Sequence, residues 1–119
     1  MMNQEDVPSY VTSEIPEMGQ EMKDNIKNAS IYQIMHQLVN YTNGQLQQNN
    51  FSYAGKCFQV VSKLYSQGNK AVKCAIENTY VYALDKTIMS YNSNRERIIG
   101  LIPHDLYSIY VRQIICSNI

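Results

Sequence analysis

The chain has 119 residues, 45% of them hydrophobic, so it is long enough for one domain with a single buried core. Ten Asp and Glu balance ten Lys and Arg, and the resulting net charge of zero argues against a dedicated nucleic-acid or membrane-surface binder. Cys57, Cys74 and Cys116 are widely spaced and only two histidines are present, which argues against a zinc site of the usual kind. We therefore expect a cytoplasmic protein with no metal, no cofactor and no membrane association.

The N-terminal part of the chain predicts an arm followed by two helices. Residues 1–12 show no periodicity, and we expect a flexible arm there and a single helical domain over residues 13–119. Pro16 and a thin stripe through Met18, Met22 and Ile26 predict a helix of about three turns. Ser30 and Gln33 are spaced as a capping box, and the helix they open is predicted to extend to Leu46.

The stretch from Phe51 to Met89 predicts two helices joined at Gly68–Asn69. We expect Ser52 to cap the first helix, Gly68 to adopt a positive φ at its end, and Asn69 to cap the second helix. A turn this short requires the two helices to pack antiparallel. Apolar steps of three and four mark their buried faces: Ala54, Cys57, Phe58, Val61, Leu64 and Tyr65 in the first, and Val72, Ala75, Ile76, Thr79, Tyr80, Ala83, Leu84 and Ile88 in the second.

The last part of the chain predicts two shorter helices. Ser93 and Glu96 form a second capping-box pattern, and Pro103 separates the helix that follows from a final one. Leu106, Ile109, Tyr110, Gln113 and Ile114 place the buried face of that final helix. The predicted fold class is therefore all-α, a compact bundle of about five helices around a central antiparallel helical hairpin.

Several short runs resemble a family of small helical bacterial proteins classed only as a domain of unknown function. They are Asn50-Phe51, Gly55-Lys56, Leu64-Tyr65, Gly68-Asn69, Val72-Lys73, Ala75–Asn78, Leu101–Pro103, Leu106 and Tyr110–Gln113. The resemblance covers most of residues 15–114 and implies the helical fold, but no activity, substrate or catalytic residue. In size and class, though not in motif, the chain is also similar to immunity proteins that neutralise bacterial toxins.

Candidate catalytic groups are sparse. His36 and His104 are far apart in the sequence, and a structural or solvent-facing role is expected for both. Glu77 and Asp85 fall near one face of a predicted helix, where two carboxylates with different pKa values could perform acid–base chemistry. Ordinary surface pairing with neighbouring lysines explains them more simply. We therefore expect no enzymatic activity.

Tyrosine is the residue type in excess, with ten copies against two Phe and no Trp. Tyr82 and Tyr107 lie off the predicted apolar stripes and, with Arg112, form a candidate interface anchor, since Tyr and Arg dominate interface hot spots. The alternative is that each tyrosine lies at the edge of the core.

Lysines on the central helices form a candidate basic strip. Lys56, Lys63, Lys70 and Lys73, with aromatic residues nearby, could bind single-stranded nucleic acid, although solvated lysines are the usual finding on an outer helix face. Residues 1–50 hold six acids and two bases, whereas residues 51–119 hold four acids and eight bases. These opposite charges suggest either that the two halves face each other or that the second half binds an acidic partner.

The preferred function is a non-catalytic, cytoplasmic protein-interaction module of the inhibitor or immunity type. Its protein partner is unknown, and a homodimer stays open. The alternative is nucleic-acid or anionic-ligand binding through the basic second half, with nucleic acid the less favoured ligand. A third hypothesis is a small hydrolase that uses Glu77 and Asp85.

Overall fold

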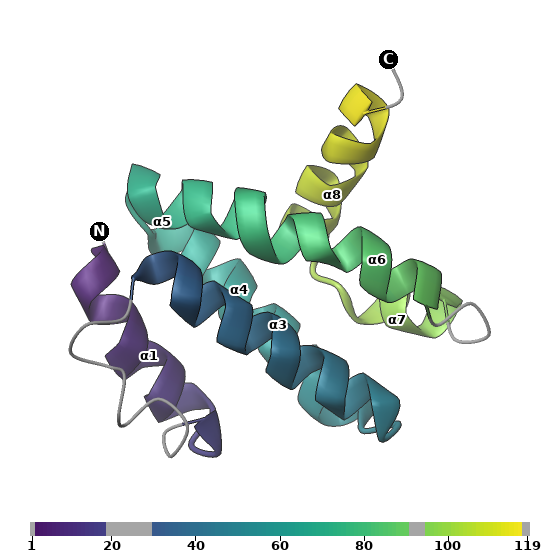
Figure 1. The fold of residues 1–119 in the computed structure, drawn as a ribbon, viewed down its shortest axis with the longest axis horizontal. Coiled ribbons are helices and arrows are strands. Elements are labelled where there is room, and N and C mark those ends of the chain that lie inside the picture. Colours follow the sequence, from purple (N-terminus) through teal and green to yellow (C-terminus); the bar gives the residue numbers. More distant parts are fainter. Residues whose placement is uncertain (1, 19–29, 91–94, 118–119) are drawn as a thin grey trace.

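Helices form where apolar residues recur at steps of three and four. The computed structural model describes residues 2–18, 30–90 and 95–117, and Figure 1 shows an all-helical arrangement within them. The elements are η1 (Gln4–Asp6), α1 (Val7–Glu14), α3 (Ile31–Gln47), α4 (Phe51–Gln67), α5 (Lys70–Ala75), η2 (Ile76–Val81), α6 (Tyr82–Ser90), α7 (Arg95–Leu101) and α8 (His104–Ser117). Because α5, η2 and α6 follow one another without a break, the described residues form six main helices and no β-strand, which confirms the predicted all-α bundle.

The central pair of helices is α3 and α4. They lie side by side, and the continuous helix formed by α5, η2 and α6, called the long helix below, packs against α3 through η2 (Figure 1). Leu38, Phe58, Val61 and Ile76 are among the fully buried side chains at the centre of this arrangement. One cluster of buried residues joins all the larger elements, from Val7 in α1 to Tyr110 in α8.

Most of residues 1–12, for which the sequence predicts a flexible arm, are helical in the described part of the chain. Val7 to Glu14 form α1, whose Val7 and Val11 side chains are completely buried, and α1 packs against α4. The backbone of Met2 is also fixed, because its N–H donates to the Gln67 carbonyl and its carbonyl accepts from the Asn69 N–H. Most of the helix predicted from Pro16 through Met22 to Ile26 lies outside the described residues.

Helix caps follow the sequence at some positions and depart from it at others. The capping box of Ser30 and Gln33 is present, and the Asn69 side chain accepts from the Val72 N–H as predicted. Ser52 is not a cap, because the helix already begins at Phe51 and Asn50 occupies the N-cap position. The predicted capping box at Ser93 lies outside the described residues.

Gly68 does not adopt the positive φ predicted for it. Its φ of −76° and ψ of 155° are those of extended backbone, which any residue can adopt. Glycine is required for a different reason: a Cβ atom here would lie 2.6 Å from the Leu64 carbonyl oxygen and 2.6 Å from Val72 Cγ1. The turn between α4 and α5 is therefore set by close packing and not by left-handed backbone.

The long helix contains a feature that the sequence interpretation missed, the π-helical segment η2. The apolar residues Val72, Ile76, Tyr80, Leu84 and Ile88 repeat at steps of four, and all are buried. In an α-helix, steps of four turn the apolar stripe by about 40° each time, so the stripe would leave the core over this length. The wider turn of a π-helix offsets that rotation and keeps all five side chains on one side.

The C-terminal helices pack against α4 and the long helix. α7 packs against α4 and α6, with the Arg97 guanidinium 4.0 Å from the centre of the Phe51 ring. Beyond Pro103, α8 contacts α4, η2 and α6 and stands at a steep angle to the long helix in Figure 1. None of the helices in the described residues is long and apolar enough to cross a lipid bilayer.

Candidate functional site

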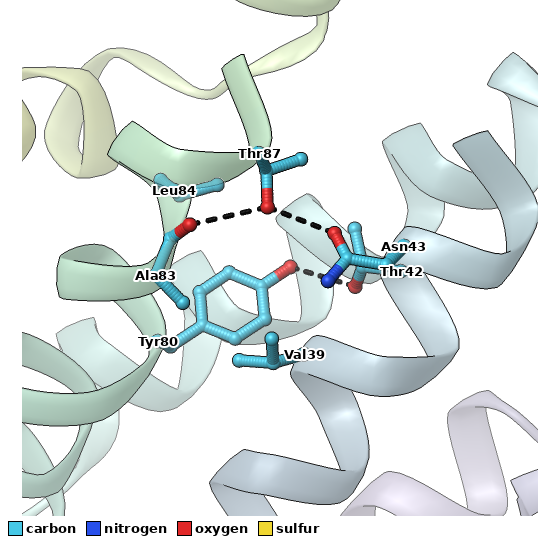
Figure 2. Close-up of a pocket in the computed structure, with 7 residues that line it drawn as sticks. All are labelled: Val39, Thr42, Asn43, Tyr80, Ala83, Leu84 and Thr87. Atoms are coloured by element: carbon cyan, nitrogen blue, oxygen red, sulfur yellow. Dashed lines mark hydrogen bonds between the residues drawn. The ribbon is translucent and has the colours of Figure 1, made fainter. Parts of the chain in front are cut away.

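The π-helical segment η2 presents polar groups on two sides, and the inner side faces α3. Tyr80 is 1% exposed, and its hydroxyl lies 2.9 Å from Thr42 Oγ1 (Figure 2). Thr42 Oγ1 donates its one proton to the Leu38 carbonyl at 2.7 Å, so the Tyr80 hydroxyl must be the donor to Thr42. Burial raises the pKa of Tyr80 far above its ordinary value, which keeps this donor protonated.

A small cavity lies beside this hydrogen-bonded chain. Figure 2 shows it between α3 and the long helix, lined by Val39, Thr42, Asn43, Tyr80, Ala83, Leu84 and Thr87. Its volume of about 10 Å³ corresponds to roughly one water molecule. The Thr87 hydroxyl is already engaged by Asn43 Oδ1 at 2.8 Å and the Ala83 carbonyl at 3.1 Å. The inner side of η2 is therefore a satisfied polar network with no room for an organic ligand.

The outer side of η2 faces α8 across an open hollow. Glu77 and Asn78 of η2 and Ile109, Arg112 and Gln113 of α8 line it, and it holds about 240 Å³ of solvent-accessible space. The side chains of Asn78 and Arg112 are exposed, whereas Glu77 and Gln113 are half-buried. We call this region the η2–α8 hollow. It combines a carboxylate, a guanidinium and two amides, a set suited to polar recognition.

Three polar contacts hold α8 in place beside the hollow. Gln113 Nε2 donates to the Glu77 carbonyl at 2.8 Å, and Tyr110 Oη donates to Asp85 Oδ1 at 3.3 Å. At the other end of α8, Ser62 Oγ lies 2.6 and 2.8 Å from the two carboxylate oxygens of Asp105. These contacts to α4, η2 and α6 fix the position of the hollow's α8 wall.

Helix α4 holds the side chain of Glu77. Tyr65 Oη donates to Glu77 Oε1 at 3.0 Å, and Lys73 Nζ lies 5.7 Å from the centre of the Tyr65 ring. The pKa of Tyr65 is raised, first by desolvation and then by its hydrogen bond to the Glu77 carboxylate and that group's charge, while Arg112 lowers it. The Glu77 side chain is therefore tied to α4 while it lines the hollow beside α8.

The structure places the three predicted interface residues differently. Tyr82, at the start of α6, has 73% of its surface exposed and lies four residues beyond Asn78, but it is not among the residues that line the hollow. Tyr107 is half-buried, and its ring lies 6.1 Å from that of Tyr110. Within the described residues, no hydrogen bond or ring contact joins Tyr107 to Tyr82 or Arg112. Arg112 thus lines the hollow, Tyr82 is exposed outside its lining, and Tyr107 lies at the edge of the core.

The four lysines of the predicted basic strip do not form one uniform surface. Lys56, Lys63 and Lys70 are exposed, whereas Lys73 is half-buried beside the Tyr65 ring. Lys56 lines a different hollow, together with Glu14 and Glu17. Nucleic-acid binding through these residues stays a prediction.

The residues considered for catalysis are separate from one another. Each carboxylate accepts from its own tyrosine, Glu77 from Tyr65 and Asp85 from Tyr110, and Asp85 does not line the η2–α8 hollow. His36 and His104 are exposed, as expected. Within the described residues, no three His, Cys, Asp or Glu side chains gather in a way that could hold a metal ion. Burial raises the pKa of the Cys57 thiol to about 11, which keeps it protonated and unreactive.

Sequence reasoning identified Glu77, Lys73 and Arg112 but assigned them to three different hypotheses. It missed the hydroxyl of Tyr65 and the amides of Asn78 and Gln113 as partners in the same place. One signal was present: Gln113 falls on a face predicted to be apolar, and a polar residue there needs a buried partner. That partner, the Glu77 carbonyl, could not be identified without the path of α8.

Comparisons with known proteins identify the family of this chain but do not indicate its activity. A family model described as a domain of unknown function (DUF7674) matches residues 8–116, so the chain belongs to that family and the resemblance drawn from the sequence is confirmed. No curated protein and no solved structure matches the chain significantly.

Proposed function

We propose that this member of the family is a non-catalytic protein-interaction module that binds its partner over the η2–α8 hollow. The observation that carries this proposal is the exposed Arg112 in the lining of a hollow with fixed walls, with the exposed Tyr82 four residues beyond Asn78 of that lining. Tyr and Arg are the residue types that contribute most to protein interfaces. Their backbones are fixed by the contacts of α8 with η2 and α6, which limits the ordering cost of binding.

The shape and lining of the hollow favour a protein partner over a small molecule. Small-molecule sites are usually enclosed, mostly apolar and about 300–1,000 Å³ in volume. The η2–α8 hollow is smaller, at about 240 Å³, and four of its five lining residues are polar or charged. A protein surface can insert one or two side chains into it and also cover the exposed Tyr82.

The cytoplasm is the compartment that we propose, because Cys57 and Cys74 are free thiols. An inhibitor or an immunity-type protein is the kind of module that fits, since such a protein acts by surface complementarity and needs no catalytic group. A second copy of the chain is the other partner to consider.

Site-specific photo-crosslinking tests the proposal. A photoreactive phenylalanine analogue at position 82 in the full chain, expressed in its native cells, should capture one discrete protein. Combining it with Arg112→Ala should remove most of that adduct, because the guanidinium anchors the partner. The matched control is the same analogue at Tyr32, which is 43% exposed on α3.

Adducts of the same size and amount at positions 82 and 32 would show that capture is unspecific and would refute the proposal. So would an adduct at position 82 that is unchanged by Arg112→Ala. Sedimentation equilibrium then decides whether the captured partner is a second copy of the chain.

A further inference from the structure

A second hollow lies where the end of α1 meets α3 and α4. Glu14, Ile15, Pro16, Glu17, Tyr41, Tyr53 and Lys56 line it, and it holds about 110 Å³ of solvent-accessible space. None of these residues lines the η2–α8 hollow. We call it the α1 hollow, and no sequence pattern described above predicts a role for it.

The charges around the α1 hollow favour a cation. Two carboxylates, Glu14 and Glu17, and one ammonium, Lys56, give the lining a net negative charge. Glu14 is the last residue of α1, so the negative end of that helix's dipole lies at the hollow and adds to its negative potential. Lys56 is exposed and attached by a flexible chain, so a bound cation can displace its ammonium into solvent.

Two tyrosines complete the lining and fix one carboxylate. Tyr41 Oη donates to Glu17 Oε2 at 3.3 Å, which keeps that carboxylate beside the hollow. Desolvation, followed by the charge of Glu17, raises the pKa of Tyr41 to about 12, so the hydroxyl remains a donor. Tyr53 is 52% exposed, and its aromatic side chain is available to an incoming cation.

We propose that the α1 hollow binds an organic cation, a guanidinium or alkylammonium group of the kind carried by an arginine or lysine side chain. Such cations are weakly hydrated compared with metal ions and gain from aromatic side chains as well as carboxylates. A metal ion such as Ca²⁺ is held mainly by carboxylate, carbonyl and amide oxygens, and the lining offers only two carboxylates, whereas no three His, Cys, Asp or Glu side chains of the described residues gather in a way that could hold a metal ion. This site does not depend on the η2–α8 hollow, because the two share no residue.

NMR titration of the full chain tests the cation site directly. N-acetyl-arginine amide should cause saturable shifts in the backbone amides of Glu14, Glu17, Tyr41 and Tyr53 at constant ionic strength. N-acetyl-citrulline amide, which has nearly the same shape but no charge, should cause none. A parallel titration with tetramethylammonium distinguishes preference for a guanidinium from preference for an alkylammonium. Equal shifts with the arginine and citrulline ligands would refute the proposal.

Three variants sharpen the test. Glu17→Gln keeps an oxygen that accepts from Tyr41, so the fold should persist while the affinity for the arginine ligand falls about tenfold. Glu5→Gln, an exposed acid of η1 outside the hollow, should leave the affinity unchanged. Lys56→Met removes the competing ammonium and should tighten binding about threefold. Equal affinities for Glu17→Gln and Glu5→Gln, or weaker binding by Lys56→Met, would overturn the proposal.

Discussion

Tyr80 and Glu77 lie three residues apart on one π-helical segment, yet their polar groups are in opposite situations. The Tyr80 hydroxyl is fully buried and belongs to a chain of hydrogen bonds that ends at the Leu38 carbonyl. The Glu77 carboxylate is held at one side by Tyr65 but opens on its other side into a hollow of about 240 Å³. A buried polar group must be satisfied within the protein, whereas a group at an open hollow can bind something else. The inner side of the long helix thus supports the fold, and its outer side is the region that we propose for recognition.

The largest expected difference in stability is between a substitution in the core and a substitution in the hollow. Phe58→Ala should lower the free energy of unfolding by ~3–5 kcal/mol, because its side chain is completely buried. Arg112→Ala, at an exposed position, should change it by less than about 0.5 kcal/mol. Urea denaturation measures both. Similar losses for the two variants would show that the outer side also carries stability.

Gly68 tests whether close packing, and not backbone conformation, fixes the start of the long helix. Gly68→Ala should cost ~2–3 kcal/mol, because its Cβ would approach the Leu64 carbonyl oxygen to 2.6 Å. Ala is the informative substitution, since extended backbone itself does not penalise it. Gly44→Ala is the control: a Cβ there meets nothing within 4 Å, so the change should be neutral or slightly stabilising. An unchanged denaturation midpoint for Gly68→Ala would contradict the packing explanation.

The hydrogen bond between Tyr80 and Thr42 should contribute differently to the free energy of unfolding depending on which of the two hydroxyls is removed. Thr42→Val leaves the Tyr80 hydroxyl buried without its acceptor, which should cost ~1–2 kcal/mol. Tyr80→Phe leaves Thr42 still donating to Leu38, so it should cost less, about 0.5–1 kcal/mol. Chemical denaturation of the two variants and the double variant gives both values and their coupling. A larger loss for Tyr80→Phe would reverse the donor assignment within the network.

The smallest expected effect is the pH dependence of stability that comes from Tyr41. Its pKa in the folded protein is raised to about 12 from an ordinary value of 10.0. Its contribution to stability is therefore complete below about pH 10 and is lost as the pH rises toward 12. In a pH titration followed by the ultraviolet absorbance of tyrosinate, the Tyr41→Phe variant should lack one step that the parent chain shows near pH 12. The prediction fails if the variant and the parent chain titrate alike.

The sequence predicted helices well and the candidate site poorly, for physical reasons. Ser30 and Gln33 form a capping box over three residues, and Pro103 acts on its immediate neighbours, so both could be predicted from local sequence. Helix α1 could not be predicted, because it is short and only weakly periodic and its burial depends on contacts with α4. The hydrogen bond between Gln113 and the Glu77 carbonyl joins residues 36 positions apart, and no local pattern specifies it.

The π-helical turn at Ile76–Val81 limits how the chain can vary in length. An α-helical turn in its place would rotate every later residue of the long helix by roughly 100°, the equivalent of one residue. Leu84 and Ile88 would then leave the core unless one residue were also removed. Deleting one residue inside this turn would therefore shorten the buried helix and still keep Leu84 and Ile88 in the core. The deletion would replace the π-helical turn by an α-helical one, and the hydrogen bond from Gln113 to the Glu77 carbonyl would be lost.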